Sequence, residues 1–127
     1  MANLRTPLSQ VKGLGSAKEG TGHFWVQRLT AIGLIPLVVW VTFAVARLPS
    51  MSQADIQTWL SSPFSAVLMI LFLIAAFWHA KLGLQVVIED YVSNHAVRTV
   101  AIIAVTLISF ALAVTGVFSV LRIAFTG

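Results

Sequence analysis

The chain has 127 residues, of which 58% are hydrophobic and 9% are charged. Soluble domains carry about 25% charged residues, so this composition excludes an ordinary water-soluble fold and favours lipid as the solvent. The net charge of +4 does not indicate nucleic-acid binding, because the eight lysines and arginines are scattered near helix ends and form no stripe.

The sequence contains no cysteine, which excludes a disulfide, a thiolate metal site, an iron–sulfur cluster and a cysteine nucleophile from this chain. Residues 1–27 are polar and relatively rich in glycine and serine, and they lack the apolar run of a secretory signal. They are also poor in arginine, which argues against a mitochondrial transit peptide. We therefore expect a retained cytoplasmic tail and a bacterial origin.

Three apolar runs are long enough to cross a membrane as helices. The first lies between Arg28 and Arg47, a helical length of about 28 Å that matches roughly 30 Å of hydrocarbon. The second follows Ser62, the expected N-cap, with Pro63 in its first turn. We predict a single all-α integral membrane domain, residues 1–127, with transmembrane helices over about residues 28–48, 63–89 and 97–123.

The loop between the first two spans contains a predicted short interfacial helix, Ala54 to Leu60, anchored by Trp59. Pro36 can kink the first span without ending it, because membrane helices tolerate proline. Positive charges crowd the N-terminal side of that span. The positive-inside rule therefore predicts a cytoplasmic N-terminus and, after three crossings, a periplasmic C-terminus.

His79 lies well inside the second span, where an imidazole is costly unless it has a ligand or a hydrogen-bond partner. A structural histidine bonded to a neighbouring helix and a metal or haem ligand both meet this requirement. Gly83, about 40° around the helix, either leaves room for a flat macrocycle or permits close helix packing. His23 and His95 fall in the polar flanks, so a haem held by two histidines needs its second ligand from another subunit.

The end of the second span carries Glu89, Asp90 and Tyr91, which a quinone headgroup could use as hydrogen-bonding groups, although a solvated helix end explains them too. Acidic residues at a helix C-terminus oppose the macrodipole, which gives the functional interpretation some weight. On an ideal helix Asp90 lies about 20° from His79, and Tyr91 about 120° away. Arg28 begins the first span, where it either pairs with a haem propionate or anchors the helix as a positive-inside charge.

Lys81 is the only other charge inside the second span. It lies about 200° from His79, so we expect it to face away from any haem and to extend along the helix towards the headgroups. No chemistry is assigned to it.

The second span resembles the signature of the hydrophobic membrane-anchor subunit, the D subunit, of succinate dehydrogenase: it reads His79-Ala-Lys-Leu-Gly-Leu-Gln-Val-Val-Ile-Glu-Asp-Tyr-Val92. The family pattern is a histidine, a glycine four residues on, a Gln-Val pair, and Asp-Tyr ending twelve residues after the histidine. The stretch Gly20-Thr-Gly-His-Phe-Trp-Val-Gln-Arg28-Leu-Thr-Ala and the three-span layout extend the resemblance over nearly the whole chain. The chain lacks the Ser-Pro-His type motif that opens the C subunit.

The resemblance implies that His79 is an axial ligand of the iron of haem b, shared with a histidine of the cytochrome b subunit, and that Tyr91 contacts ubiquinone. Arg28 matches the family arginine near the haem propionates and quinone pocket, and Asp90 matches a position beside the quinone tyrosine. Two further partners are implied, a flavoprotein subunit and an iron–sulfur subunit, in a multi-pass complex of the bacterial inner membrane.

The implied role is that of a non-catalytic subunit, which docks its partners and contributes to electron transfer from succinate to ubiquinone. Two alternatives stay open. One is the related anchor of a fumarate reductase that uses menaquinone. The other is a structural accessory membrane protein without a cofactor, in which His79 and Gly83 only pack helices.

Overall fold

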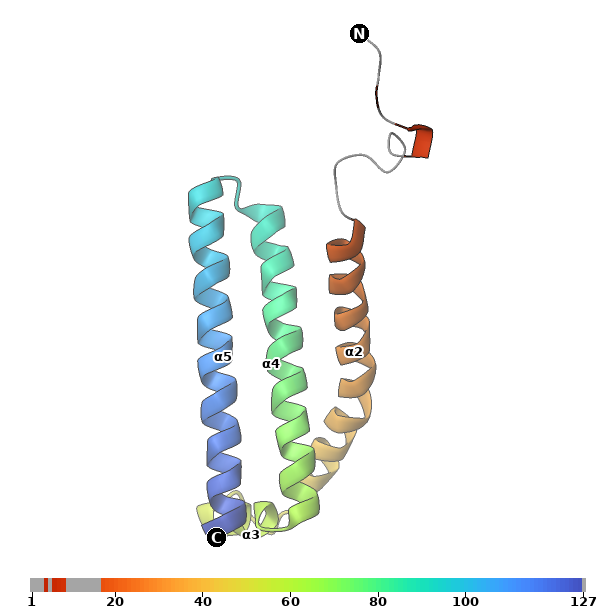
Figure 1. Ribbon diagram of the computed structural model, residues 1–127. Helices are drawn as coiled ribbons and strands as arrows, with labels where there is room; N and C mark the ends of the chain where they lie inside the picture. The colour runs from red at the N-terminus through yellow and green to blue at the C-terminus, as the bar shows by residue number, and fades with distance from the viewer. Residues whose placement is uncertain (1–3, 5, 9–16, 127) are drawn as a thin grey trace.

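The computed structural model describes residue 4, residues 6–8 and residues 17–126. Figure 1 labels four helices: α2 (Ala17–Ala46), α3 (Gln53–Leu60), α4 (Pro63–Tyr91) and α5 (His95–Thr126). The described residues form no strand, which confirms the predicted all-α class. Three helices are long and apolar enough to cross a membrane, as predicted: Thr21–Ala46, Pro63–Tyr91 and His95–Thr126.

α4 is the central helix of the bundle. It packs against α2 on one side and against α5 on the other, and within the described residues α2 and α5 do not approach each other. The N-terminal half of α2, the end of α4 and the α4–α5 connection lie at one end of the bundle, which we call the Tyr91 end (Figure 1). α3 and the C-terminus lie at the opposite end.

The start of the first span was predicted wrongly. α2 begins at Ala17 instead of near residue 28, and its 30 residues correspond to about 45 Å, well beyond the thickness of the hydrocarbon layer. Hydropathy locates the part of a helix that suits lipid, and a helix can continue past it into water. Pro36 lies inside α2, whose second half leans towards α4 in Figure 1, as expected for a proline kink.

The other span boundaries lie close to the prediction. Ser62 is the N-cap residue of α4 and Pro63 opens the helix, although the Ser62 side chain makes no capping hydrogen bond. Proline suits this position because its missing N–H would lack an intrahelical partner there in any case. α4 continues to Tyr91, and α5 runs from His95 to Thr126, a little beyond the predicted ends.

α3 confirms the short helix expected between the first two spans. Its N-cap, Ser52, accepts a hydrogen bond from the Asp55 amide at 3.2 Å. The Ser50 hydroxyl donates to the Asp55 carboxylate, and hydrogen bonding of this carboxylate by the side chains of Ser50 and, to a lesser extent, Ser52 lowers the pKa of Asp55 from its usual 3.8. Trp59 packs against Trp40 of α2, with ring centroids 5.7 Å apart. This aromatic pair ties α3 to the first span.

The chain buries little apolar surface on its own. Among the described residues the buried hydrophobic side chains are Leu60, Ala66, Leu82 and Val120. Large side chains such as Ile32 and Phe110 remain 66% and 69% exposed. Such apolar faces suit lipid or helices of another membrane subunit.

Candidate functional site

His79 lies half-buried on the side of α4 that packs against α2. Its Nδ1 is 3.1 Å from Oγ1 of Thr30, which is the one side-chain hydrogen bond between two spans in the described part of the chain. A histidine bonded to a neighbouring helix, one of the two interpretations left open by the sequence, is therefore observed. This bond uses one ring nitrogen only, because no described residue bonds to Nε2.

Gly83 leaves open space one helical turn from His79. A Cβ added at this position would meet no atom within 4 Å. Gly116 of α5 behaves differently, since a Cβ there would lie 3.1 Å from Cδ1 of Leu73 and so marks a close approach of α4 and α5. Packing within this chain therefore does not explain Gly83, and the space beside His79 is available to a group from outside the chain.

Gln27 contributes a buried polar atom without a partner. Its Oε1 accepts no hydrogen bond from the described residues, although buried amide oxygens nearly always have a donor. It precedes Thr30 by about one turn on α2. Neither residue was singled out from the sequence, and the available signal was that both are polar and lie at or inside the edge of an apolar run.

The described residues contain no group of three or more histidine, cysteine, aspartate or glutamate side chains arranged to hold a metal ion. His79 therefore stands as a single potential ligand. A haem iron needs one or two axial protein ligands rather than a cluster, because the macrocycle occupies the other positions. The free Nε2 and the open space at Gly83 fit one side of such a group.

Tyr91 is the last residue of α4 and is 84% exposed. The helix stays regular to this point, so Tyr91 does not turn onto the face of His79, whereas Asp90 shares that face by helical geometry and is exposed. The two residues lie roughly 17 to 18 Å from His79 along the axis. No hydrogen bond among the described residues joins Arg28, Asp90 and Tyr91. Because Thr30 contacts His79, Arg28 lies near the level of His79 and well short of Tyr91 along the axis, so this chain alone does not bring the three residues together.

Two arginines make defined contacts, one on α2 and one on α5. The guanidinium of Arg28 lies over the ring of Phe24, 5.2 Å from its centroid, and its side chain is exposed. Arg98 donates through Nε to the carbonyl of Val92 at 2.9 Å and thereby holds the loop that follows Tyr91. The contact with Phe24 orients the Arg28 guanidinium along α2, and the hydrogen bond from Arg98 fixes the backbone where α4 ends.

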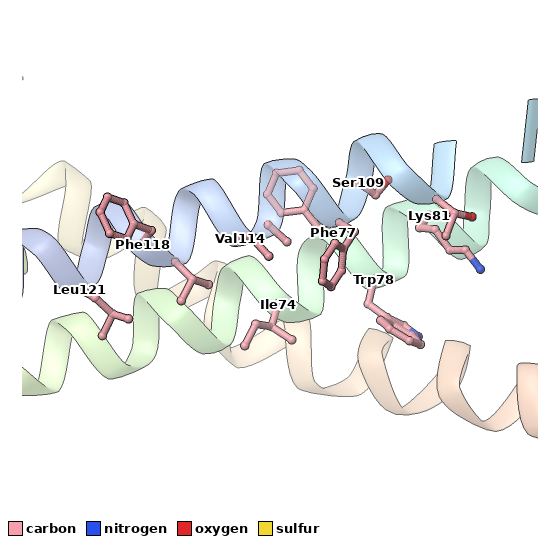
Figure 2. Close-up of a pocket in the computed structure, with 12 residues that line it drawn as sticks. Ile74, Phe77, Trp78, Lys81, Ser109, Val114, Phe118 and Leu121 are labelled. Atoms are coloured by element: carbon pink, nitrogen blue, oxygen red, sulfur yellow. The ribbon is translucent and has the colours of Figure 1, made fainter. Parts of the chain in front are cut away.

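Lys81 extends along α4 as predicted. Its Nζ donates to Oε1 of Gln85 at 2.9 Å, and Nε2 of Gln85 donates to Oε1 of Glu89 at 2.9 Å, so a chain of hydrogen bonds leads towards the Tyr91 end. Figure 2 shows Lys81 at one end of an apolar groove of about 520 Å³ between α4 and α5. His79 does not line this groove, which agrees with the opposite orientation expected for the two side chains.

Comparison with known proteins identifies the family of the chain, which the geometry alone does not. Residues 2–116 match the family model of the succinate dehydrogenase/fumarate reductase transmembrane subunit. The chain belongs to this family. The predicted resemblance is thereby confirmed, and with its three apolar helices the chain is a multi-pass membrane protein.

Three relatives make the assignment more specific. The succinate dehydrogenase hydrophobic membrane anchor subunit of Rickettsia bellii is 37% identical over 84% of this chain and 86% of its own length. That of Paracoccus denitrificans is 32% identical over 92% and 90%, respectively. The succinate dehydrogenase membrane anchor subunit of Reclinomonas americana is 32% identical over 72% and 79%. The chain is thus assigned to the succinate dehydrogenase anchors, which associate with the other subunits of their complex.

Proposed function

We propose that this anchor subunit supplies one axial ligand of haem b through His79 and shares the haem with the cytochrome b subunit. The observation that carries the proposal is the state of the His79 ring: Nδ1 is bonded to Thr30, Nε2 has no partner among the described residues, and the space at Gly83 is open. A neutral imidazole with one free nitrogen is a common metal ligand. When bound, the haem supplies a one-electron redox centre.

The same proposal gives the subunit part of a ubiquinone-reduction site at the Tyr91 end. The exposed hydroxyl of Tyr91 can donate to a quinone carbonyl, on which negative charge develops during reduction. Asp90 offers an acceptor beside it, and Arg28 offers five donors to a haem propionate or to the quinone pocket. The remaining walls of the pocket come from partner subunits.

The remaining steps of electron transfer belong to partners. The chain has no cysteine for an iron–sulfur cluster, so we assign succinate oxidation and the early electron transfer to the flavoprotein and iron–sulfur subunits, docked at the Tyr91 end. In this proposal the N-terminus lies in the cytoplasm and the C-terminus in the periplasm of a bacterial inner membrane, as the positive-inside rule predicts. The exposed apolar faces of the spans would receive the cytochrome b subunit and lipid.

The haem assignment is tested with the purified complex carrying His79→Ala. The reduced-minus-oxidised visible spectrum, normalised to flavin, should show b-type haem in the wild type and a strong loss in this variant. His95→Ala is the matched control, because His95 lies at the first residue of α5 and should leave the spectrum unchanged. A wild-type complex without b-type haem, or an unaltered spectrum in His79→Ala, would overturn the proposal.

A further inference from the structure

We propose that Thr30 fixes the tautomer of the His79 ring, so that Nδ1 carries the hydrogen and Nε2 keeps the lone pair that would bind the iron. Thr30 is then a positioning residue that acts through His79 and touches neither haem nor quinone. The inference rests on the haem-ligand role proposed for His79, and its experiment separates the two claims.

The hydrogen-bond geometry around Thr30 determines which group donates. The Thr30 hydroxyl has one hydrogen and three neighbours: the carbonyl oxygens of Val26 at 2.8 Å and Gln27 at 3.0 Å, and Nδ1 of His79 at 3.1 Å. A carbonyl oxygen only accepts, so both short oxygen contacts require the hydroxyl hydrogen. The hydrogen in the third contact must then come from Nδ1, and Thr30 Oγ1 accepts it.

The reverse arrangement leaves two repulsive contacts. If the hydroxyl donated to Nδ1, Thr30 Oγ1 would face two carbonyl oxygens within 3.0 Å with no hydrogen between them. Other threonines in these helices also donate their hydroxyl hydrogen to the carbonyl oxygen four residues earlier. The oxygen–oxygen distances are 2.7 to 2.8 Å at Thr42, Thr106 and Thr115. The three contacts of the Thr30 hydroxyl together therefore favour the His79 tautomer that carries its hydrogen on Nδ1.

This assignment has consequences for His79 as a ligand. Histidines that bind metals usually donate their second N–H to an acceptor, which orients the ring and strengthens the ligating nitrogen as an electron donor. The Thr30 oxygen is polarised as an acceptor by its own bond to the α2 backbone. Loss of the hydroxyl should weaken electron donation through Nε2 and so disfavour the ferric form more than the ferrous form.

The test uses the whole purified complex with Thr30→Val, which has nearly the same shape without the hydroxyl, and Thr30→Ser, which keeps it. We expect Thr30→Val to lower the preference for ferric iron by up to about tenfold, equivalent to a rise of about 59 mV in the midpoint potential of a one-electron couple. The electron paramagnetic resonance spectrum of the oxidised haem should change as well. Thr30→Ser should match the wild type in both measurements.

The outcomes separate the two claims. If His79→Ala abolishes the haem while Thr30→Val keeps the wild-type potential and resonance spectrum, the role of Thr30 is overturned and that of His79 stands. If His79→Ala keeps the haem, the haem-ligand role fails first. If Thr30→Val does not assemble, Thr30→Ala replaces it, because alanine and serine differ by the hydroxyl alone. Failure of both hydroxyl-free variants to assemble would assign Thr30 to helix packing and would also overturn the inference.

Discussion

Enlarging Gly83 tests whether the space beside His79 belongs to a haem. The variants are Gly83→Ala and Gly83→Leu, and the matched controls are Gly33→Ala and Gly33→Leu in α2. At both glycines an added Cβ meets no atom of the chain within 4 Å, so neither alanine creates a clash within the subunit. Replacing glycine by alanine inside a helix stabilises it by about 0.5 to 1 kcal/mol, and both alanine variants should share this gain.

The two positions should differ once a haem is present. Overpacking typically costs about 1 to 3 kcal/mol, which corresponds to roughly 5-fold to 150-fold weaker binding of the group that is displaced. We therefore expect Gly83→Leu to lower the ratio of haem to flavin in the purified complex severalfold or more, with a smaller loss in Gly83→Ala. Both Gly33 variants should retain the wild-type ratio.

A separate variant controls for packing inside the chain. Gly116→Ala places a Cβ 3.1 Å from the flexible end of Leu73, so it should perturb the contact between α4 and α5 without removing haem. Full haem content and an unchanged visible spectrum in Gly83→Leu would refute the assignment of this space to a haem. Gly83 would then be an ordinary helix glycine that faces lipid or a partner helix.

Three further predictions concern Tyr91, Arg28 and Asp55. Tyr91→Phe should impair ubiquinone reduction while succinate oxidation with an artificial dye survives; equal turnover with both acceptors contradicts the quinone role. Arg28→Lys keeps the positive charge but loses the bidentate donor geometry of the guanidinium, so haem content or ubiquinone affinity should fall. If neither changes, Arg28 serves only as a positive-inside charge that orients the first span. Asp55 has a lowered pKa, so its contribution to stability is present above pH 3.8 and is lost as the pH falls through the folded-state pKa. Ser50→Ala should raise that pKa towards 3.8 in a nuclear magnetic resonance titration, and an unchanged pKa would count against the serine contact.

Hydropathy and local signals predicted most of the fold. The second span was located from its apolar run and from Ser62 and Pro63, because lipid thickness and helix-start chemistry both act on neighbouring residues. The start of α2 at Ala17 was missed for the opposite reason, since a helix continues into water wherever its residues tolerate it. Lys81 was oriented correctly because its direction follows from helical geometry alone.

The candidate site could be predicted only in part. His79 can be recognised from the sequence because a polar ring in an apolar run is energetically costly, and this cost depends only on the residues of its own helix. Its bond to Thr30 depends on how α2 is rotated against α4, which no spacing within either helix determines. The open space at Gly83 and the unpartnered oxygen of Gln27 become visible only once the neighbouring helix is in place. The second haem ligand and the remaining quinone contacts that we propose would come from other subunits, so this sequence does not contain them.

The most direct measurement of the central claim replaces the proposed ligand with a different one. Methionine also binds haem iron and raises its reduction potential, so the purified complex with His79→Met should show histidine–methionine ligation in its near-infrared and resonance spectra. Its midpoint potential should lie above that of the wild type. A His79→Met complex that retains the wild-type bis-histidine spectrum and potential would show that the ligand is a different residue and would contradict the account.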